Sequence, residues 1–511
     1  MMDYINSLDW SKIPDLLRYH MESPMIFSSG LFFVLFLGFL PLYGLLRKTT
    51  TLRIIYVVLF SLFFYYKSSG IYVLLLLFAT TSDFLIAHRM SKVTDQNMRK
   101  RWVALSILIN LGILSYFKYF NFLADLITQG ISSLGIAVGN ETVSSLQWEA
   151  WDIFLPVGIS FYTFQTMSYI IDVYRGDVKP LKRWIDYTFY VSFFPQLVAG
   201  PIVRAKDFIP QIHRHPMVSR GEFGRGLFLI ILGLLKKAII SDYISLNFVD
   251  RVFDAPTLYS GVENLMAVYG YALQIYCDFS GYSDMAIGIA LFLGFHFNKN
   301  FDVPYTSTNI TEFWRRWHIS LSTWLKDYLY IPLGGNRKGK VRTYINLIIT
   351  MLLGGLWHGA ALRFILWGGM HGLALALHKI WGTLFHRKGK VQKRYIAGKL
   401  LGGIITFHFV CFAWIFFRAD SIAIVEEVVN QIIYQFHPEI MWDFVVGYRW
   451  VLLLMLIGYT LHYLPKTWRR ASERWLVRAP FVVQMLLLVV LIFLVFQFKS
   501  ADVQPFIYFQ F

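Results

Sequence analysis

Long apolar runs set between short basic segments are the feature of this sequence that most limits its possible folds. Examples are residues 26–46, 71–87, 226–240, 343–356 and 479–498. A run of roughly 15–25 apolar residues can cross the hydrocarbon core of a bilayer, and a chain inside lipid must form helices so that its backbone groups bond one another. Only 15% of the residues are charged, against about a quarter in soluble domains. We therefore predict an all-α polytopic membrane protein.

The positions of the lysines and arginines predict how the chain is threaded through the membrane. Seven connecting segments hold 35 of the 48 basic residues: 47–53, 89–101, 174–187, 204–225, 314–342, 386–399 and 466–478. Segments 128–152 and 419–447 hold acids and no lysine or arginine. Because basic residues near span ends stay on the cytoplasmic side, the alternation predicts about 11–12 transmembrane helices, with the N-terminus outside. The prediction adds a re-entrant stretch at 188–203 and an interfacial region at 312–335.

The net charge of +17 follows from that distribution. We interpret it as orientation and contact with lipid headgroups, and not as binding of nucleic acid. Residues 1–24 lack the apolar core of a cleavable signal and are expected to form an N-terminal extracytoplasmic segment. Residues 25–511 are predicted to form one integral membrane domain. Cys277 and Cys411 both lie in apolar segments, so no structural disulfide is expected.

Polar residues at membrane depth are costly, which makes them candidates for function. His358 lies in "GGLWHGA", between Trp357 and Gly359. A neutral, buried histidine is a competent general base toward a hydroxyl group. The alternative is a core histidine bonded to a carbonyl between packed helices. His318, in "FWRRWHISLSTW", poses a similar choice between a functional residue and part of an anchoring amphipathic helix.

Other polar residues in the same region also admit structural interpretations. Arg315 suits an anchor at the membrane interface. The glycine-rich turn 333–340, which contains Asn336, either cradles a phosphate or donor headgroup through backbone N–H groups or is an ordinary cytoplasmic turn. Asp278 and Asp284 are six residues apart and do not share a helix face. They either line a polar cavity or pair with an arginine, and we favour the pairing.

Several kinds of chemistry find no support in the spacing of residues. The Walker sequence G-x-x-x-x-G-K-[ST] and the nucleophile elbow G-x-S-x-G are both absent. His371 and His378 would lie about 10 Å apart along a helix, which is too far for one ion. We therefore predict no metal and no tightly bound cofactor, and we expect any attacking nucleophile to belong to the acceptor.

Five longer stretches carry a resemblance to a known family: "LPVGISFYTFQTMSYIIDVYRGD" (155–177), "FFPQLVAGPIVR" (193–204), "YCDFSGYSDMAIGIALFLGF" (276–295), "ITEFWRRWHISLSTWLKDYLYIPLGGNRKG" (310–339) and "MLLGGLWHGAALRFILWGGMHG" (351–372). Together they resemble the membrane-bound O-acyltransferases. The resemblance is strongest to the membrane subunit of alginate O-acetylation and its relatives in bacterial polysaccharide acetylation. It runs in order from about 25 to 420, with a motif core at about 153–382.

The resemblance implies helices around a central cavity that opens toward both faces of the bacterial cytoplasmic membrane. The family's catalytic histidine falls on His358, and its second polar position falls on His318. In this interpretation His358 takes the proton of an acceptor hydroxyl, and His318 orients it or stabilises the developing oxyanion. Further substrate contacts are expected from Trp357, Trp317, Asn336, Asp278, Asp284 and Arg315.

The resemblance also implies the reactants. The donor is acetyl-CoA or another acyl thioester made in the cytosol, and the acceptor is an exported or cell-surface polysaccharide. An extracytoplasmic SGNH-hydrolase-like acetyltransferase is the expected protein partner, and membrane lipid surrounds the chain.

Two other functions remain open at this point. One is transfer of a D-alanyl or other acyl group to a lipid, a protein or a teichoic-acid-like acceptor. The other is a transporter or flippase, because intramembrane acids and histidines are common in proton-coupled carriers. The sequence lacks the inverted repeat that many transporters show, which weighs against the second.

Overall fold

The fold was analysed in a computed structural model. It describes residues 24–133, 151, 153–385 and 396–498, together with residues 15, 17–21, 137–138 and 141–142. The predicted N-terminal segment 1–24 therefore lies mostly outside the described residues. Nearly all regular structure is α-helical, and the two strands, β1 (Ala137–Val138) and β2 (Glu141–Thr142), form one short antiparallel pair. The predicted all-α class is confirmed.

The chain forms two compact units that alternate along the sequence. The first unit comprises Met1–Leu114, Phe154–Val198 and Arg204–Pro216, and the second comprises Ser115–Ile153, Ala199–Val203 and Met217–Phe511. The helices of the first unit are α3 (Gly30–Leu46), α4 (Thr50–Ser69), α5 (Val73–Ser91), α6 (Gln96–Leu114), α8 (Ile159–Arg175), α9 (Trp184–Ser192), α10 (Phe194–Leu197) and α11 (Ala205–Ile212).

A buried polar cluster joins three helices of the first unit. Asp83 of α5 accepts hydrogen bonds from Ser106 Oγ at 2.6 Å and Asn110 Nδ2 at 2.9 Å, both on α6. Thr166 of α8 donates to Asn110 Oδ1 at 2.9 Å. An unpaired polar group costs several kcal/mol in lipid, so this closed set of bonds holds α5, α6 and α8 in register.

The second unit begins with a π-helical turn, Ser115–Tyr119, and α7 (Phe120–Ser133). Its larger helices are α12 (Arg220–Leu234), α15 (Gly261–Phe292), α18 (Lys340–His358), α19 (Leu362–Phe385), α20 (Ile396–Arg418), α21 (Ile422–Tyr434), α23 (Arg449–Tyr463), α24 (Lys466–Arg478) and α25 (Phe481–Phe498). The shorter ones are α13 (Asp242–Ile244), α14 (Asp250–Asp254), α16 (Ile310–Arg316), α17 (Ile319–Leu325) and α22 (Met441–Gly447).

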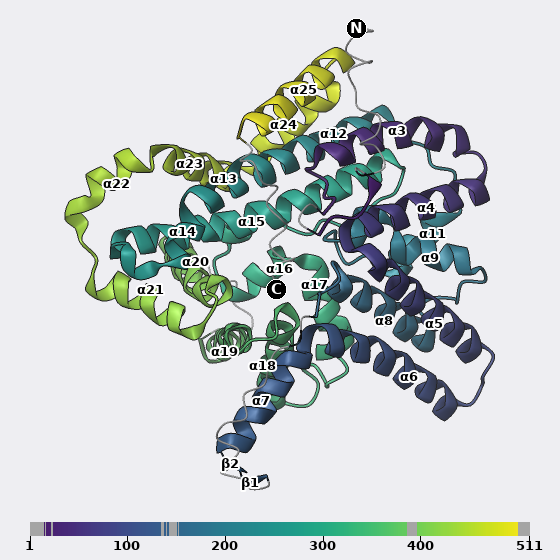
Figure 1. The fold of residues 1–511 in the computed structure, drawn as a ribbon, viewed down its shortest axis with the longest axis horizontal. Helices are drawn as coiled ribbons and strands as arrows, with labels where there is room; N and C mark the ends of the chain where they lie inside the picture. Colours follow the sequence, from purple (N-terminus) through teal and green to yellow (C-terminus); the bar gives the residue numbers. More distant parts are fainter. Residues whose placement is uncertain are drawn as a thin grey trace. The chain divides into compact units, whose positions relative to one another are not determined.

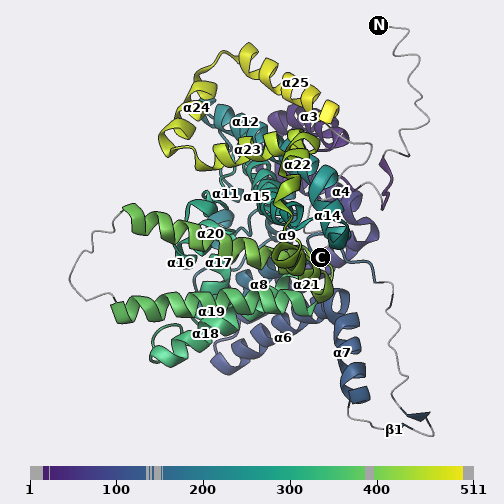
Figure 2. The same cartoon turned by 90° about the vertical axis from the view of Figure 1, so that its left-hand side faces the viewer.

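Two helix pairs make the frame of the second unit. The helices α12 and α15 lie side by side, as Figure 1 shows, and α18 and α19 form a hairpin that is clearest in Figure 2. Glycines allow the hairpin to close: a Cβ added at Gly355 of α18 would lie 2.2 Å from the carbonyl oxygen of Phe364. A Cβ at Gly368 of α19 would lie 2.2 Å from that of Met351. Only glycine fits such a backbone contact.

Several helices meet the requirements of a membrane span. By length and composition, three described helices qualify: Thr50–Ser91, Gln96–Gly130 and Ile396–Arg418. Two bent pairs, Pro438–Gly447 with Arg449–Tyr463 and Lys466–Arg478 with Phe481–Val495, raise the number to five if each pair is one span. The helix Gly30–Leu46 is apolar but shorter than these candidates. The multi-pass membrane architecture is thus supported, and the figure of 11–12 crossings stays a prediction.

Candidate active site

His358 is the last residue of α18, and its ring is enclosed by aromatic side chains. Only 3% of its surface is exposed. The ring centroids of Trp357, Trp367 and Phe417 lie 4.9, 5.1 and 5.1 Å from that of His358. The helix stops here because Gly359 is extended, with φ of −165°. The side chain is therefore buried among aromatic rings and does not face lipid or open solvent.

Two residues of the π-helical turn Ser115–Tyr119 donate hydrogen bonds to the last backbone carbonyls of α18. The Lys118 ammonium donates to the carbonyl oxygens of Trp357 and His358, both at 2.8 Å. The Tyr119 hydroxyl donates to the carbonyl of Leu356, also at 2.8 Å. The last carbonyls of a helix have no partner within it and carry partial negative charge, so a cation is stabilising there. Lys118 thereby fixes the backbone from which the His358 ring projects.

His318 is held by a separate set of bonds centred on Asn300. The His318 Nδ1 lies 3.1 Å from Asn300 Oδ1, which also accepts from the hydroxyl of Ser320 at 2.9 Å and from its backbone N–H at 3.2 Å. Because an amide oxygen only accepts, the ring donates from Nδ1, and the neutral tautomer keeps its lone pair on Nε2. The network extends to Ser283, which accepts from Asn300 Nδ2 at 3.1 Å, and to Ile202, whose N–H donates to Ser320 at 3.1 Å.

The backbone at His318 is itself unusual. The residue precedes α17 with φ of 40° and ψ of 59°, in the left-handed region. Non-glycine residues seldom adopt this conformation, and it is enriched at functional sites where surrounding contacts impose it. The bond from the Ile319 N–H to the carbonyl of Asn300, at 2.8 Å, is one such contact.

One tryptophan ring connects the two predicted histidines. The Trp357 centroid lies 4.9 Å from that of His358 and 6.3 Å from that of His318. The structure therefore brings His358, His318 and Trp357 together inside the second unit. The closed surroundings of His358 also mean that the expected passage to both membrane faces is not open at this ring.

The remaining predicted substrate contacts are Trp317, Arg315, Asn336, Asp278 and Asp284. Trp317 is buried within the aromatic core. Its ring centroid lies 5.7 Å from that of Phe313, on which it stacks, and 5.0 Å from that of Trp414. Arg315 is exposed at the end of α16, and Asn336 is exposed on the turn before α18. Neither Arg315 nor Asn336 belongs to the hydrogen-bond networks described above for His358 and His318.

The two predicted acids form ion pairs, as favoured, but their partners are lysines and not an arginine. Asp278 lies 2.5 Å from the ammonium of Lys237, and Asp284 lies 2.6 Å from that of Lys236. Lys237 also contacts Asp242 at 2.8 Å. The lysines come from the π-helical turn Leu235–Ser241 that follows α12, and the acids come from α15. These pairs join two helices, which is a structural role.

Sequence reasoning missed three residues that organise the site: Lys118, Tyr119 and Asn300. Lys118 carried a usable signal, because a lysine inside an apolar stretch is a functional candidate by default. Asn300 carried none, since it lies in the connection before α16 and its bond to His318 spans 18 residues. The closely spaced Gly354, Gly355 and Gly359 accommodate protein groups, namely Leu325, the backbone of α19 and the ring of Phe364.

Comparison with known proteins identifies the class to which this helical membrane protein belongs. The profile of the membrane-bound O-acyltransferase family matches residues 183–421. The chain is 39% identical over 401 residues to a probable alginate O-acetylase AlgI of Azotobacter vinelandii, covering 78% of this chain and 76% of that protein. The chain belongs to the membrane-bound O-acyltransferase family, and the resemblance seen in the sequence is confirmed.

Two further relatives show how widely the similarity extends. The first is a probable alginate O-acetylase AlgI of Pseudomonas syringae pv. tomato, 43% identical over 323 residues that cover 63% of this chain and 58% of that protein. The second is a peptidoglycan O-acetyltransferase of Helicobacter pylori, 36% identical over 366 residues that cover 66% of each. The chain thus spans about three fifths of the length of the Pseudomonas relative.

Proposed function

We propose that this chain is a membrane O-acyltransferase that moves an acetyl group from a cytosolic thioester, acetyl-CoA or another acyl thioester, for O-acetylation of an exported or cell-surface polysaccharide. Family membership supports the reaction class. So do the names of two relatives, a probable alginate O-acetylase and a peptidoglycan O-acetyltransferase. The observation that carries the proposal is the pair of buried histidines, His358 and His318, whose rings both lie near the Trp357 ring.

His358 acts as the general base. Its neutral ring takes the proton from an acceptor hydroxyl, whose oxygen then attacks the thioester carbonyl carbon. The C–O bond forms, a tetrahedral oxyanion results, and its collapse breaks the C–S bond. The leaving thiolate takes the proton back from the His358 ring, so the histidine is regenerated. Exclusion of water by the surrounding rings favours transfer to the acceptor over hydrolysis of the thioester.

His318 orients the reacting groups. Because the Nδ1–H of His318 donates to Asn300, the other ring nitrogen, Nε2, is a hydrogen-bond acceptor. A hydroxyl or a ring N–H would donate to it. Stabilisation of the oxyanion by this ring would first require a proton on Nε2, so orientation is the role that its bonding favours.

The delivery of the acetyl group is also part of the proposal. The chain lies in the bacterial cytoplasmic membrane with its N-terminus outside, as the distribution of basic residues favours. The donor approaches from the cytosol and the acceptor from the other side. The acetyl group passes to the polysaccharide directly or through an SGNH-hydrolase-like extracytoplasmic acetyltransferase, and substrate reaches His358 when the enclosing rings move apart.

The test is acetyl transfer by the full-length protein in sealed vesicles, with labelled acetyl-CoA outside and polysaccharide inside. His358→Ala is expected to lower transfer by at least about 100-fold. His408→Ala is the matched control, because His408 is exposed on α20 and its ring hydrogen-bonds the carbonyl of Ile404 in its own helix. Full transfer by a folded and inserted His358→Ala protein would refute the proposal. Solute movement with no acyl turnover would favour a carrier, and transfer of D-alanyl in place of acetyl would favour the other acyl group.

A further inference from the structure

A basic helix lies where the chain enters its last apolar segment. The helix α24 holds five basic residues and one acid, Glu473, and α25 behind it is almost wholly apolar. The chain bends by 115° between the two helices. We expect the apolar α25 to lie in hydrocarbon, and the sharp bend then directs the basic α24 toward the level of the lipid headgroups.

The helix α24 is fixed by one face, so its opposite face has a defined direction. Leu476 is buried, and Val477 packs so closely on α12 that a Cβ added at Gly224 would lie 2.9 Å from its Cα. Glu473, the only acid of α24, lies 3.5 Å from Arg225 of α12. Glu473 therefore pairs with α12 on the protein side of α24. It does not offset the positive charge on the outward face of α24.

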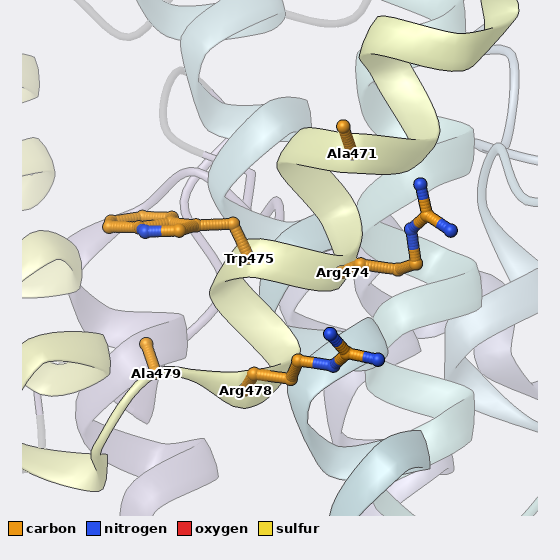
Figure 3. Close-up of a pocket in the computed structure, with 5 residues that line it drawn as sticks. All are labelled: Ala471, Arg474, Trp475, Arg478 and Ala479. Carbon is orange, nitrogen blue, oxygen red and sulfur yellow. The ribbon is translucent and has the colours of Figure 1, made fainter.

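The outward face of α24 carries a hollow that is lined by basic, aromatic and small apolar side chains. Its walls are Ala471, Arg474, Trp475, Arg478 and Ala479. Figure 3 shows the guanidinium groups of Arg474 and Arg478 on one side of α24 and the flat Trp475 ring on the other, with Ala471 between them. Trp475 is 60% exposed, as is expected of a ring that meets lipid and not the protein core. The methyl group of Ala471 leaves the space between the two sides open.

We propose that this hollow binds the headgroup of an anionic phospholipid. Arg474 and Arg478 are four residues apart and share a helix face, so both reach one phosphate, which guanidinium groups bind through paired hydrogen bonds. The Trp475 ring covers the glycerol and the first carbons of an acyl chain, the position that tryptophan takes at membrane interfaces. Ala471 and Ala479 leave room for the lipid. The site is separate from the histidines and does not rest on the proposed function.

The experiment compares lipid retention by the full-length protein. Protein is purified from nanodiscs of equimolar phosphatidylglycerol and phosphatidylcholine, and bound lipid is counted by native mass spectrometry. Wild-type protein is expected to retain phosphatidylglycerol selectively. Arg474→Gln/Arg478→Gln should lower that selectivity at least about tenfold, which is equivalent to about 1.4 kcal/mol, because both charge-assisted bonds to the phosphate are lost.

Two variants separate a specific site from general surface charge. Arg89→Gln/Arg101→Gln removes the same charge from two other exposed arginines and should leave selectivity unchanged. Ala471→Leu fills the hollow without changing charge and should lower retention of phosphatidylglycerol. Equal loss in the Arg89/Arg101 variant, or wild-type retention in the Arg474/Arg478 variant, overturns the proposal. So does displacement of the lipid by millimolar inorganic phosphate, because the site would then be one for the free ion.

Discussion

Lys118 donates hydrogen bonds from its ammonium to the backbone carbonyl of His358 at 2.8 Å and to that of Trp357 at the same distance. The residue that is proposed to take the proton is thus held at its backbone by a cation from another helix. Lys118 thus both fixes the position of the His358 backbone and places a positive charge at the end of α18.

Lys118→Met should therefore lower the kcat of acetyl transfer about 10–100-fold, because a small displacement of a catalytic group has effects of that size. The KM for the thioester should stay within about twofold, since Lys118 is not expected to bind it. Lys118→Arg keeps the cation and should restore part of the rate. A Lys118→Met protein that is folded and as fast as wild type would show that the bonds to the carbonyls do not position His358.

Asn300→Ala should remove the acceptor that fixes the His318 tautomer and should lower the rate about tenfold or more. Ser320→Ala removes one of the bonds to the Asn300 oxygen and should have a smaller effect. Rates of acetyl transfer and the thermal stability of both variants are to be measured together. If Ser320→Ala is the slower enzyme at equal stability, the proposed role of Asn300 fails.

The ion pair between Lys236 and Asp284 predicts a non-additive effect on stability. Lys236→Met leaves Asp284 as a charge without its 2.6 Å partner and should lower the free energy of unfolding by about 3 kcal/mol. The double variant Lys236→Met/Asp284→Leu should recover part of that loss, because both charges are gone. The measurement is the unfolding temperature in detergent. Additive losses would mean that the two side chains stabilise the protein independently.

Gly355→Ala should destabilise the α18–α19 hairpin by about 1–3 kcal/mol, because the added Cβ would lie 2.2 Å from the carbonyl oxygen of Phe364. Gly382→Ala in α19 is the control, since a Cβ there meets nothing within 4 Å. That change should be neutral or stabilising by up to about 1 kcal/mol, as expected for Gly to Ala within a helix. Equal unfolding temperatures for the two variants would show that the hairpin yields more easily than its contacts indicate.

The N-terminus of α12 predicts a dependence of stability on pH. Ser219 donates from its hydroxyl and its backbone N–H to Glu222, and His296 also bonds that carboxylate, which together lower the pKa of Glu222 to about 2. A carboxyl with a lowered pKa stabilises the fold above its unfolded value of about 4.3, and the gain is lost as the pH falls toward 2.

Glu222→Gln should accordingly unfold at a lower temperature than wild type at pH 7, by an amount equivalent to about 1 kcal/mol, a typical value for a helix cap. The gap should narrow between pH 4 and pH 3. Glu426→Gln, at an exposed residue within α21, should match wild type at each pH. A gap that widens on acidification would contradict the assigned direction.

The fold was predictable where bilayer thickness alone determines the structure. The apolar run 343–356 lies within α18, Lys340–His358, because a long apolar segment in lipid can only be a helix. The apolar helix Gln96–Gly130 is instead divided by the π-helical turn Ser115–Tyr119. Hydropathy does not register such a turn, because the apolar composition continues through it, and yet the turn is what presents Lys118 and Tyr119.

The site was predictable only in part, for a similar reason. The high cost of polar groups in lipid and the family motifs pointed to His358 and His318, and the structure brings them together. Their supporting bonds come from residues far away in the sequence or from loops, so no local pattern marks Asn300. Trp317 could not be assigned from its neighbours, since a tryptophan next to arginines suits an interface and a core equally well until the helix direction is known.

The bond between Lys118 and His358 spans 240 residues, which has a consequence for biogenesis. Translation delivers the helix Gln96–Gly130 to the insertion machinery long before the carbonyls that accept the hydrogen bonds of Lys118 are synthesised. Until then we expect the ammonium group of Lys118 to bind a temporary partner, such as water, lipid phosphate or a chaperone. Release of that partner when α18 arrives would mark the moment at which the newly made protein matures.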